Sequence, residues 1–343
     1  MDCSQIKSSL TNLLNLRNQF SEAYSRVDEN KDRYDPENKQ AIKESLKLMD
    51  QIRLAIKKFE SLLHVSLEQA QEIMETDNYH GFLGPEAIKQ AFGVELSPQK
   101  IPPINFTKEQ LERARKLSQF LVLRIDEVKD RSRREYRLNI ANLAEISNEH
   151  NIKLMDKNDW PATDAGPQEK DILPIKDQLP QLGWALVSRE LIPETKMKNY
   201  LEQTNILIEY LKEEVFKDQK IPKQYQEAIA EYKAKKMEYP NLAQLTDSQD
   251  EVQWKLAAKI LSNLKITKLL RRTPIEILYD LYVFKVHYGE YLLSASNSDW
   301  SSECPSGGFL ASLGIFDSVG ACADVSRPDN GNSFLGASVS CRS

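Results

Sequence analysis

Apolar residues recur at intervals of three and four along the first 63 residues of the chain. One such stripe runs from Gln5 to about Asp28, and a second runs from Ile42 to Leu63. This spacing is that of one face of an amphipathic α-helix, and Asp35-Pro36 ahead of the second stripe is a helix-start signal. The pattern predicts two helices that form an antiparallel hairpin, either a coiled-coil arm or an ordinary helix pair packed on the rest of the protein.

The pattern that follows the hairpin changes over shorter distances. Short helices are predicted at 66–76 and 84–92, around a turn from His80 to Pro85. Thr107 is a good N-cap for a further helix. Alternation and β-branched residues then predict a strand over Phe120–Ile125. This part of the chain is therefore expected to be compact and mostly helical.

Four prolines in a polar stretch between 161 and 180 are typical of a linker, so we place a domain boundary there. An apolar strand is predicted after it, at Gly183–Ser188. The next helices are marked by apolar periodicity and, for the last, by Thr273-Pro274 as N-cap and first residue. These helices are expected at 194–217, 223–237, 254–270 and 274–293.

From Ser294 onward the composition changes. Residues 294–343 hold six of the 12 glycines and no lysine, whereas the preceding residues are rich in lysine and in helix formers. Short apolar pieces bounded by Gly, Ser, Pro, Asp and Asn are typical of strands joined by turns. The sequence predicts such strands at 309–313, 320–325 and 334–341.

Composition and charge exclude several classes of protein. The chain has 343 residues, of which 41% are hydrophobic and 28% charged, with a formal net charge of −5. This is enough apolar material to build cores, and the small net charge gives no field for nucleic acid. The N-terminus lacks the features of a secretory signal, and no apolar stretch is long enough to span a membrane. We expect a cytoplasmic protein, with surface display by another route left open.

The local motifs of common catalytic sites are missing from the sequence. There is no phosphate-binding glycine loop, dinucleotide fingerprint or serine-nucleophile elbow. Asp329–Asn332 offers oxygen ligands but lacks the spacing of a calcium loop, so an Asn-Gly turn is the better interpretation. Carboxylates such as Glu202 and Glu209 lie on the polar sides of helices. We therefore expect no enzyme activity, no metal and no cofactor.

Histidines and cysteines show no ligand spacing either. Three of the four cysteines fall in the tail, at intervals that fit neither a zinc site nor a CxxC redox motif. Without an export signal we expect free thiols, with one tail disulfide as the alternative. The residues concerned are Cys3, Cys304, Cys322, Cys341 and the four separated histidines His64, His80, His150 and His287, which are expected on the surface or in packing.

One resemblance bears on the C-terminal half. The order of strand 183–188, two long helices, Asp299-Trp300-Ser301-Ser302 and short strands ending at Phe334–Arg342 resembles a C-type-lectin-like fold, which formylglycine-generating enzymes share. Within that fold it is similar to the variable proteins of diversity-generating retroelements. Gly81–Glu86, Gly183–Ser188 and Asn199–Thr204 are similar to segments of uncharacterised proteins from small-genome bacterial lineages.

The resemblance implies a fixed scaffold that carries a diversified contact face. In that family an aromatic-Ser start and a terminal strand ending near Arg bracket a hypervariable region. The implied scaffold residues are Trp184, Trp300, Gly314, Phe316, Gly320, Leu335 and Gly336. The implied contact face comprises exposed positions at Glu303, Phe309, Ala311, Ile315, Val319, Ala321, Ala323, Ser326, Asn330, Asn332 and Ser333.

The predicted fold class is α+β, with a mainly helical N-terminal body and a C-type-lectin-like domain with a β-rich tail. The predicted domains are a helical arm at 1–64, a helical accessory domain at 65–160 and the lectin-like domain at 181–343, with its variable region at 294–343. We expect a non-catalytic display protein that binds a protein or other macromolecule through residues 299–342. Two alternatives remain: a scaffold protein acting through the hairpin, which could also form a homo-oligomer, and an enzyme built on the lectin-type fold.

Overall fold

The structure, a computed structural model, describes residues 3–27, 35–63, 65–76, 78–129, 135–154, 177–293, 297–304 and 308–342. The chain is mixed α and β, about 53% helical with small sheets, which confirms the coarse part of the predicted class. His64 and most of the predicted linker at 161–180 lie outside the described residues. None of the described helices is long and apolar enough to cross a membrane.

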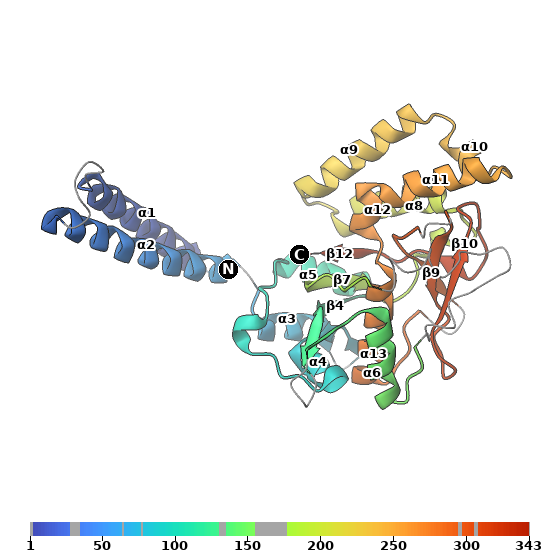
Figure 1. The fold of residues 1–343 in the computed structure, drawn as a ribbon, viewed down its shortest axis with the longest axis horizontal. Coiled ribbons are helices and arrows are strands. Elements are labelled where there is room, and N and C mark those ends of the chain that lie inside the picture. Colours follow the sequence, from blue (N-terminus) through green and yellow to red (C-terminus); the bar gives the residue numbers. More distant parts are fainter. Residues whose placement is uncertain are drawn as a thin grey trace. The chain divides into compact units, whose positions relative to one another are not determined.

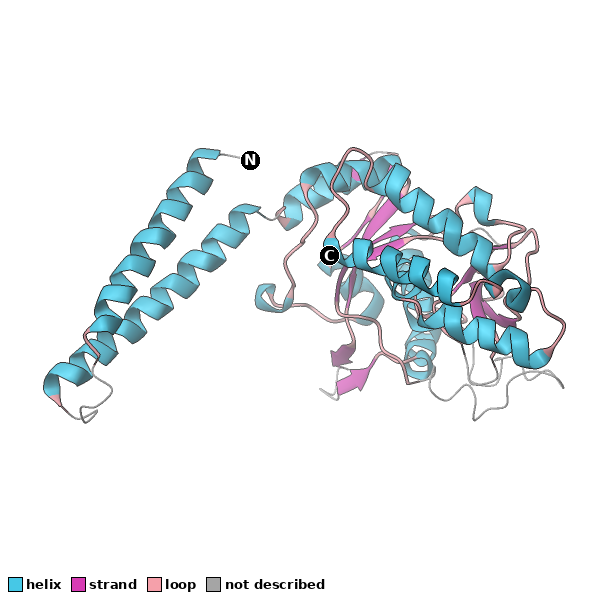
Figure 2. Cartoon of the chain, turned by 90° about the horizontal axis from the view of Figure 1, so that it is seen from above, coloured by secondary structure: helices cyan, strands magenta, loops and turns pink. Residues whose placement is uncertain are grey.

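Two compact units make up the chain, one of residues 1–69 with 103–108 and one of 70–102 with 109–343. The smaller unit contains α1 (Cys3–Ser25) and α2 (Pro36–Leu63), which run antiparallel (Figures 1 and 2). The Asp35 carboxylate accepts hydrogen bonds from the first backbone N–H groups of α2, so the helix starts where the sequence predicts. Both predicted helices of the hairpin are confirmed.

The larger unit contains a four-stranded sheet of order β12-β7-β4-β3. β4 (Gln119–Arg124) pairs antiparallel with β7 (Gly183–Ser188) and parallel with β3 (Phe82–Leu83), and β12 (Ser340–Arg342) pairs antiparallel with β7. All six residues of β4 are buried. The predicted strands at β4 and β7 are confirmed. This sheet combines strands from the predicted accessory segment with strands from the predicted lectin-like segment.

The tail forms a second four-stranded sheet, of order β10-β9-β8-β11. β9 (Leu310–Gly314) lies between β8 (Ser298–Trp300) and β10 (Cys322–Ser326) and is antiparallel to both. β11 (Leu335–Gly336) runs parallel to β8 on its other side. The predicted strands that correspond to β9 and β10 are therefore confirmed to within two residues.

One tail prediction is wrong. Residues 334–341 do not form a single strand, because the chain leaves the second sheet after β11 and joins the first sheet as β12. Ala337, Ser338 and Val339 lie between these strands and are buried. The end of the tail thus belongs to both sheets.

The long helix α13 (Pro274–Tyr288) forms the centre of the larger unit. Its residues from Pro274 to Phe284 are all buried. Thr273 and Glu276 form a capping box at its start, and Gly289, with φ of 74°, ends it. The predicted helix at 274–293 is too long, because its apolar stripe continues into residues that follow this glycine cap.

Two other predicted helices differ from the structure. The helix expected from 194 begins as α8 (Tyr200–Tyr210), because Asn199 and Glu202 form a capping box there, and a π-helical turn, Leu211–Val215, follows. The helix expected at 254–270 is divided at Leu264, whose backbone is extended, into α11 (Glu251–Asn263) and α12 (Lys265–Leu270). Local capping chemistry therefore sets these boundaries.

The remaining elements are short pieces that connect or cover these layers. They are α3 (Leu67–Met74), α4 (Pro85–Phe92), α5 (Lys108–Lys116), α6 (Ile140–Glu149), α9 (Lys223–Glu238) and α10 (Leu242–Thr246). The 3-10 turns are Pro98–Lys100 and Pro193–Thr195, and the two-stranded pairs are β1 (Glu75–Thr76) with β2 (Tyr79–His80) and β5 (Glu127–Lys129) with β6 (Glu135–Arg137).

Candidate binding surface

A buried cluster of charged side chains joins the tail to α13. Arg272 donates from Nη1 to Asp280 Oδ2 and from Nη2 to Asp299 Oδ2, both at 2.9 Å. Arg124 on β4 donates to both oxygens of Asp280, at 3.0 and 2.6 Å. Asp280 lies on α13 and Asp299 on β8. Arg272 therefore connects the first strand of the tail to the central helix.

The same cluster holds the end of the tail. Ser338 donates its backbone N–H and its hydroxyl to the two oxygens of Asp299, at 2.8 and 2.6 Å. Arg342 on β12 contacts Glu276 of α13 at 2.8 Å, and Arg124 contacts that carboxylate at 3.1 Å. Both ends of the tail are thus fixed to α13 by charge-assisted contacts.

Opposite charges keep Glu276 and Arg124 ionised although both are buried. Burial alone would raise the pKa of Glu276, but the charges of Arg124 and Arg342 outweigh it and lower this pKa to about 2. Burial acts to lower the pKa of Arg124, and the carboxylates of Asp280 and Glu276 raise it instead. The guanidinium groups of Arg124, Arg272 and Arg342 balance three carboxylates. Breaking such a buried set from one side leaves an uncompensated charge.

The residues implied as scaffold lie mostly in the interior. Trp184, Trp300, Phe316 and Leu335 are each at most 2% exposed. Trp300 packs edge-on against Tyr200 of α8, with the ring centroids 5.5 Å apart. The indole N–H of Trp184 donates to the carbonyl of Pro102 at 2.9 Å. These side chains fix both sheets against the helices.

At the glycines implied as scaffold, another segment of the chain comes close to the glycine backbone. Gly314 has φ of 154°, and a Cβ there would clash with the carbonyl oxygen of Asn297. Gly336 is packed against Leu191 and Thr195, and the half-buried Gly320, with φ of 137°, against the backbone of Lys153. A side chain at Gly314 or Gly320 would move the neighbouring backbone, and one at Gly336 would displace the side chains of Leu191 and Thr195.

The implied contact residues differ in exposure. Val319 and Ser333 are exposed, and seven others are half-buried: Glu303, Phe309, Ile315, Ala323, Ser326, Asn330 and Asn332. The expectation that Ala311 and Ala321 are exposed is wrong. Ala311 lies on β9, all five residues of which are buried, so both faces of this strand are covered. Ala321 lies against Lys153, whose carbonyl accepts its N–H at 3.0 Å.

These residues occur in separate groups rather than in one patch. Glu303 contacts Lys268 at 2.8 Å, and the Phe309 ring lies 4.9 Å from that of Trp254 on α11. Ile315 and Val319 belong to the turn between β9 and β10. The remaining group is the loop before β11, where Asn330 donates to Ser326 at 2.9 Å and accepts from Asn332 at 3.3 Å.

The strand β10 connects these groups and is an edge of its sheet. Cys322 and Asp324 of β10 are exposed. The backbone N–H of Val325 donates to the Asp324 carboxylate at 2.7 Å, a way of protecting an unpaired strand edge. We define β10 and the adjoining turn at 315–320 as the candidate binding surface.

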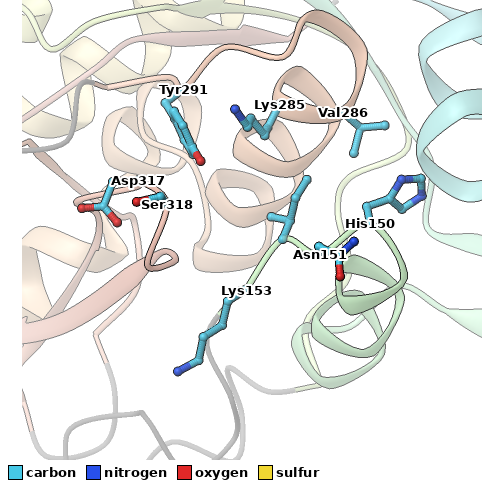
Figure 3. Close-up of a pocket in the computed structure, with 9 residues that line it drawn as sticks. His150, Asn151, Lys153, Lys285, Val286, Tyr291, Asp317 and Ser318 are labelled. Carbon is cyan, nitrogen blue, oxygen red and sulfur yellow. The ribbon is translucent and has the colours of Figure 1, made fainter.

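A hollow of about 280 Å³ adjoins the turn at one end of this surface. Figure 3 shows Tyr291, Asp317 and Ser318 on one side of it and His150 and Asn151 on the other. The Lys285 ammonium lies 3.7 Å from the centroid of the Tyr291 ring and donates to the carbonyl of Gly289 at 2.6 Å. The residues that line this hollow are mostly polar, so it suits a small polar group of a ligand.

A second, wider hollow of about 530 Å³ lies near the other end of β9, between α11, α12 and the segment that follows β8. Lys255, Lys259 and Lys268 line it together with Glu303 and Cys304. Of these residues, only Glu303 belongs to the contact face that the sequence implied, because the lysines lie on helices far away in the chain.

Two of the described cysteines are buried thiols with raised pKa values. Cys322 and Cys341 are free thiols. Burial raises the pKa of the Cys304 thiol to about 11 and that of Cys341 to about 12, so both are protonated at neutral pH and are poor nucleophiles. Within the described ranges, no group of His, Cys, Asp and Glu could hold a metal ion.

Comparison with known proteins adds no relative. No protein-family model, no curated protein and no solved structure matches the chain.

Proposed function

We propose that this protein binds a macromolecular ligand, such as another protein, through its tail at 299–342, and that it is not an enzyme. One observation carries the proposal. Both ends of the tail are fixed to α13 by the buried charged cluster, whereas the β10 edge between them presents exposed side chains. Side chains on this edge can change without loss of an anchoring contact, which is what a recognition surface on a fixed scaffold requires.

The resemblance to the variable proteins of diversity-generating retroelements supports this division. In that family the hypervariable region lies between an aromatic-Ser start and a terminal strand ending near Arg, positions that Trp300-Ser301 and Arg342 occupy here. We propose a C-type-lectin-like scaffold for 181–343, with the variable region at 294–343. The protein would act in the cytoplasm, or on the surface if another route carries it there, and would not bind nucleic acid.

The geometry of the candidate binding surface suggests how it would hold a ligand. Val319 is 77% exposed at the tip of the turn, where it provides an apolar anchor. The turn is fixed by the hydrogen bond from Ala321 N to the Lys153 carbonyl, at 3.0 Å. Because the backbone is ordered before binding, little conformational entropy is lost when a ligand contacts it.

Deep sequencing of a natural population tests the proposal. We expect substitutions to concentrate in codons 294–343, with the region encoding 1–293 as internal control, and to occur at Val319 and Ala323 while sparing Asp299 and Ser338. A tail no more variable than the rest of the chain contradicts the proposal.

A display library tests the same proposal without natural variants. Randomising Ser318, Val319, Cys322 and Asp324 is expected to give folded clones from which binders to unrelated proteins can be selected. A matched library randomised at the buried positions Ala311, Ser312, Leu313 and Ala321 is expected to give mostly unfolded clones. Failure of the first library to yield any binder, with folding intact, counts against a recognition role.

A further inference from the structure

The hairpin of α1 and α2 has almost no apolar core of its own. Among its described side chains the buried apolar ones are two alanines, Ala23 and Ala41. Six larger apolar side chains are instead between 41% and 68% exposed: Leu10, Leu14, Tyr24, Leu46, Leu54 and Ile56. A pair of helices that leaves its large side chains in water gains little from its own packing.

The exposure pattern gives the hairpin a heptad register. On α1 the less exposed positions are Leu13, Leu16, Phe20 and Ala23, spaced as a and d positions. On α2 the less exposed Ala41, Ser45, Leu48, Ile52 and Ala55 have the same spacing. In this register the ion pair from Arg26 Nη2 to Glu44 Oε2, at 2.9 Å, joins the two g positions across the hairpin. The a and d positions therefore face the partner helix, with a polar edge at g.

The opposite edge of the hairpin is apolar. In the same register Leu10, Tyr24 and Ile56 occupy e positions, and Leu14 and Leu46 occupy the adjoining b positions. Two antiparallel helices that pair through a and d place their e positions on one edge and their g positions on the other. These five residues therefore share one side of the hairpin, which we call the apolar face. Leu54 is at a c position, outside it.

We propose that the apolar face binds the same face of a second copy of this chain, giving a four-helix bundle. A face that lies on one side of the hairpin only is self-complementary under a two-fold axis and closes at two copies. The five side chains are each about half exposed, so pairing removes roughly 500 Å² per copy and about 1,000 Å² in total, the size at which specific interfaces begin.

The charges on this side of the hairpin make the self-association distinguishable from binding to an acidic partner. Arg17 and Arg53 are at e and b positions among the apolar residues, and the e and b positions from Leu10 to Tyr24 and from Ile42 to Ile56 hold no carboxylate. Two copies bring these arginines closer together. Salt that screens their repulsion is expected to strengthen the dimer, whereas it would weaken a complex with an acidic protein.

This inference is independent of the proposed recognition role of the tail. A dimer carries two candidate binding surfaces, so a multivalent ligand would bind more tightly without any new contact. Loss of the dimer would leave the binding of a single tail unchanged, which separates the two proposals experimentally.

Sedimentation velocity of the full chain at micromolar concentration tests the dimer. We expect a species of twice the 39.4 kDa chain mass, with a dissociation constant that falls between 50 mM and 500 mM salt. Leu46→Glu and Leu10→Glu should each raise that constant at least tenfold. The matched variant is Leu54→Glu, which places the same charge on another exposed leucine of α2, 68% exposed against 56% for Leu46, and should leave the dimer intact. Circular dichroism of each variant shows whether the helices remain.

A chain that is monomeric at all concentrations overturns the proposal and points to a different protein as the partner of the apolar face. A dimer that persists in Leu46→Glu and Leu10→Glu also overturns it. Equal weakening by Leu54→Glu and Leu46→Glu, with helices retained, would show that the contact does not use this face.

Discussion

Removal of the Arg272 guanidinium tests whether the buried cluster stabilises the tail. Arg272 is 1% exposed and bonds to both Asp280 and Asp299. In Arg272→Met, Asp280 keeps its two hydrogen bonds from Arg124, but Asp299 loses this positive partner and retains the bonds from Ser338. Breaking a buried ion pair from one side costs about 3–5 kcal/mol. This is a large part of the roughly 5–15 kcal/mol by which a domain is stable.

Urea unfolding followed by tryptophan fluorescence measures this loss in the larger unit, because the smaller unit contains no tryptophan. The control is Arg113→Met. Arg113 contacts Glu214 at 2.8 Å, but their side chains are 26% and 43% exposed, so its removal is expected to cost at most about 1 kcal/mol. A loss in Arg272→Met no larger than that in Arg113→Met would refute the argument that the cluster holds the tail in place.

Three further predictions concern Glu276, the turn at Val319 and the close approach at Gly314. The pKa of Glu276 is lowered from 4.5 to about 2, which contributes roughly 3 kcal/mol to the free energy of unfolding. This contribution is present above the pKa of the unfolded state and is lost as pH falls from about 4.5 toward 2. Urea midpoints measured across this range should show the fall, and Glu276→Gln should remove it. Val319→Asp, at an exposed tip, should change the free energy of unfolding by no more than about 0.5 kcal/mol, whereas Ala311→Asp places a carboxylate in the interior and should prevent stable folding; thermal melts compare the two. Gly314→Ala should cost about 2–3 kcal/mol because a Cβ meets the Asn297 carbonyl, while Gly93→Ala, with φ of 66° and no atom within 4 Å, should cost only about 1 kcal/mol in the same melts.

Elements that depend on local pattern could be predicted from the sequence. The hairpin helices have long stripes of period three and four, and Asp35 provides the cap of α2. The strands β4 and β7 are short apolar runs bounded by polar residues, and all or nearly all of their residues are buried. In these segments propensity, pattern and tertiary burial agree.

Contacts between distant residues could not be predicted. Arg124 and Asp280 are 156 residues apart in the chain, and Arg272 and Asp299 are 27 apart. One signal was present: Asp280 interrupts the apolar run of α13 and Arg124 that of β4. A charge in a segment otherwise fully buried predicts a partner, but nothing in one sequence says which residue it is.

The exposure of small residues could not be predicted from the sequence either. Ala311, Ala321 and Ala323 occur in similar surroundings in the sequence, yet the first two are buried and the third is half-buried. Alanine is compatible with either environment. Its exposure depends on whether another segment covers it, as Lys153 covers Ala321, and that is a property of the fold rather than of the local pattern.

The position of the anchors determines which part of the tail is free to vary. The hydrogen bonds from Ser338 to Asp299 close a loop across a separation of 39 residues, and this loop contains β9, β10 and β11. Closing a loop of this length costs conformational entropy, and the bonds of Asp299 to Ser338 and Arg272 offset part of this cost. Substitutions on β10 leave that closure intact, but loosening it would make the binding surface mobile before a ligand arrives. Asp299→Asn should therefore weaken ligand binding through Val319 although Asp299 is buried and lies outside the candidate binding surface.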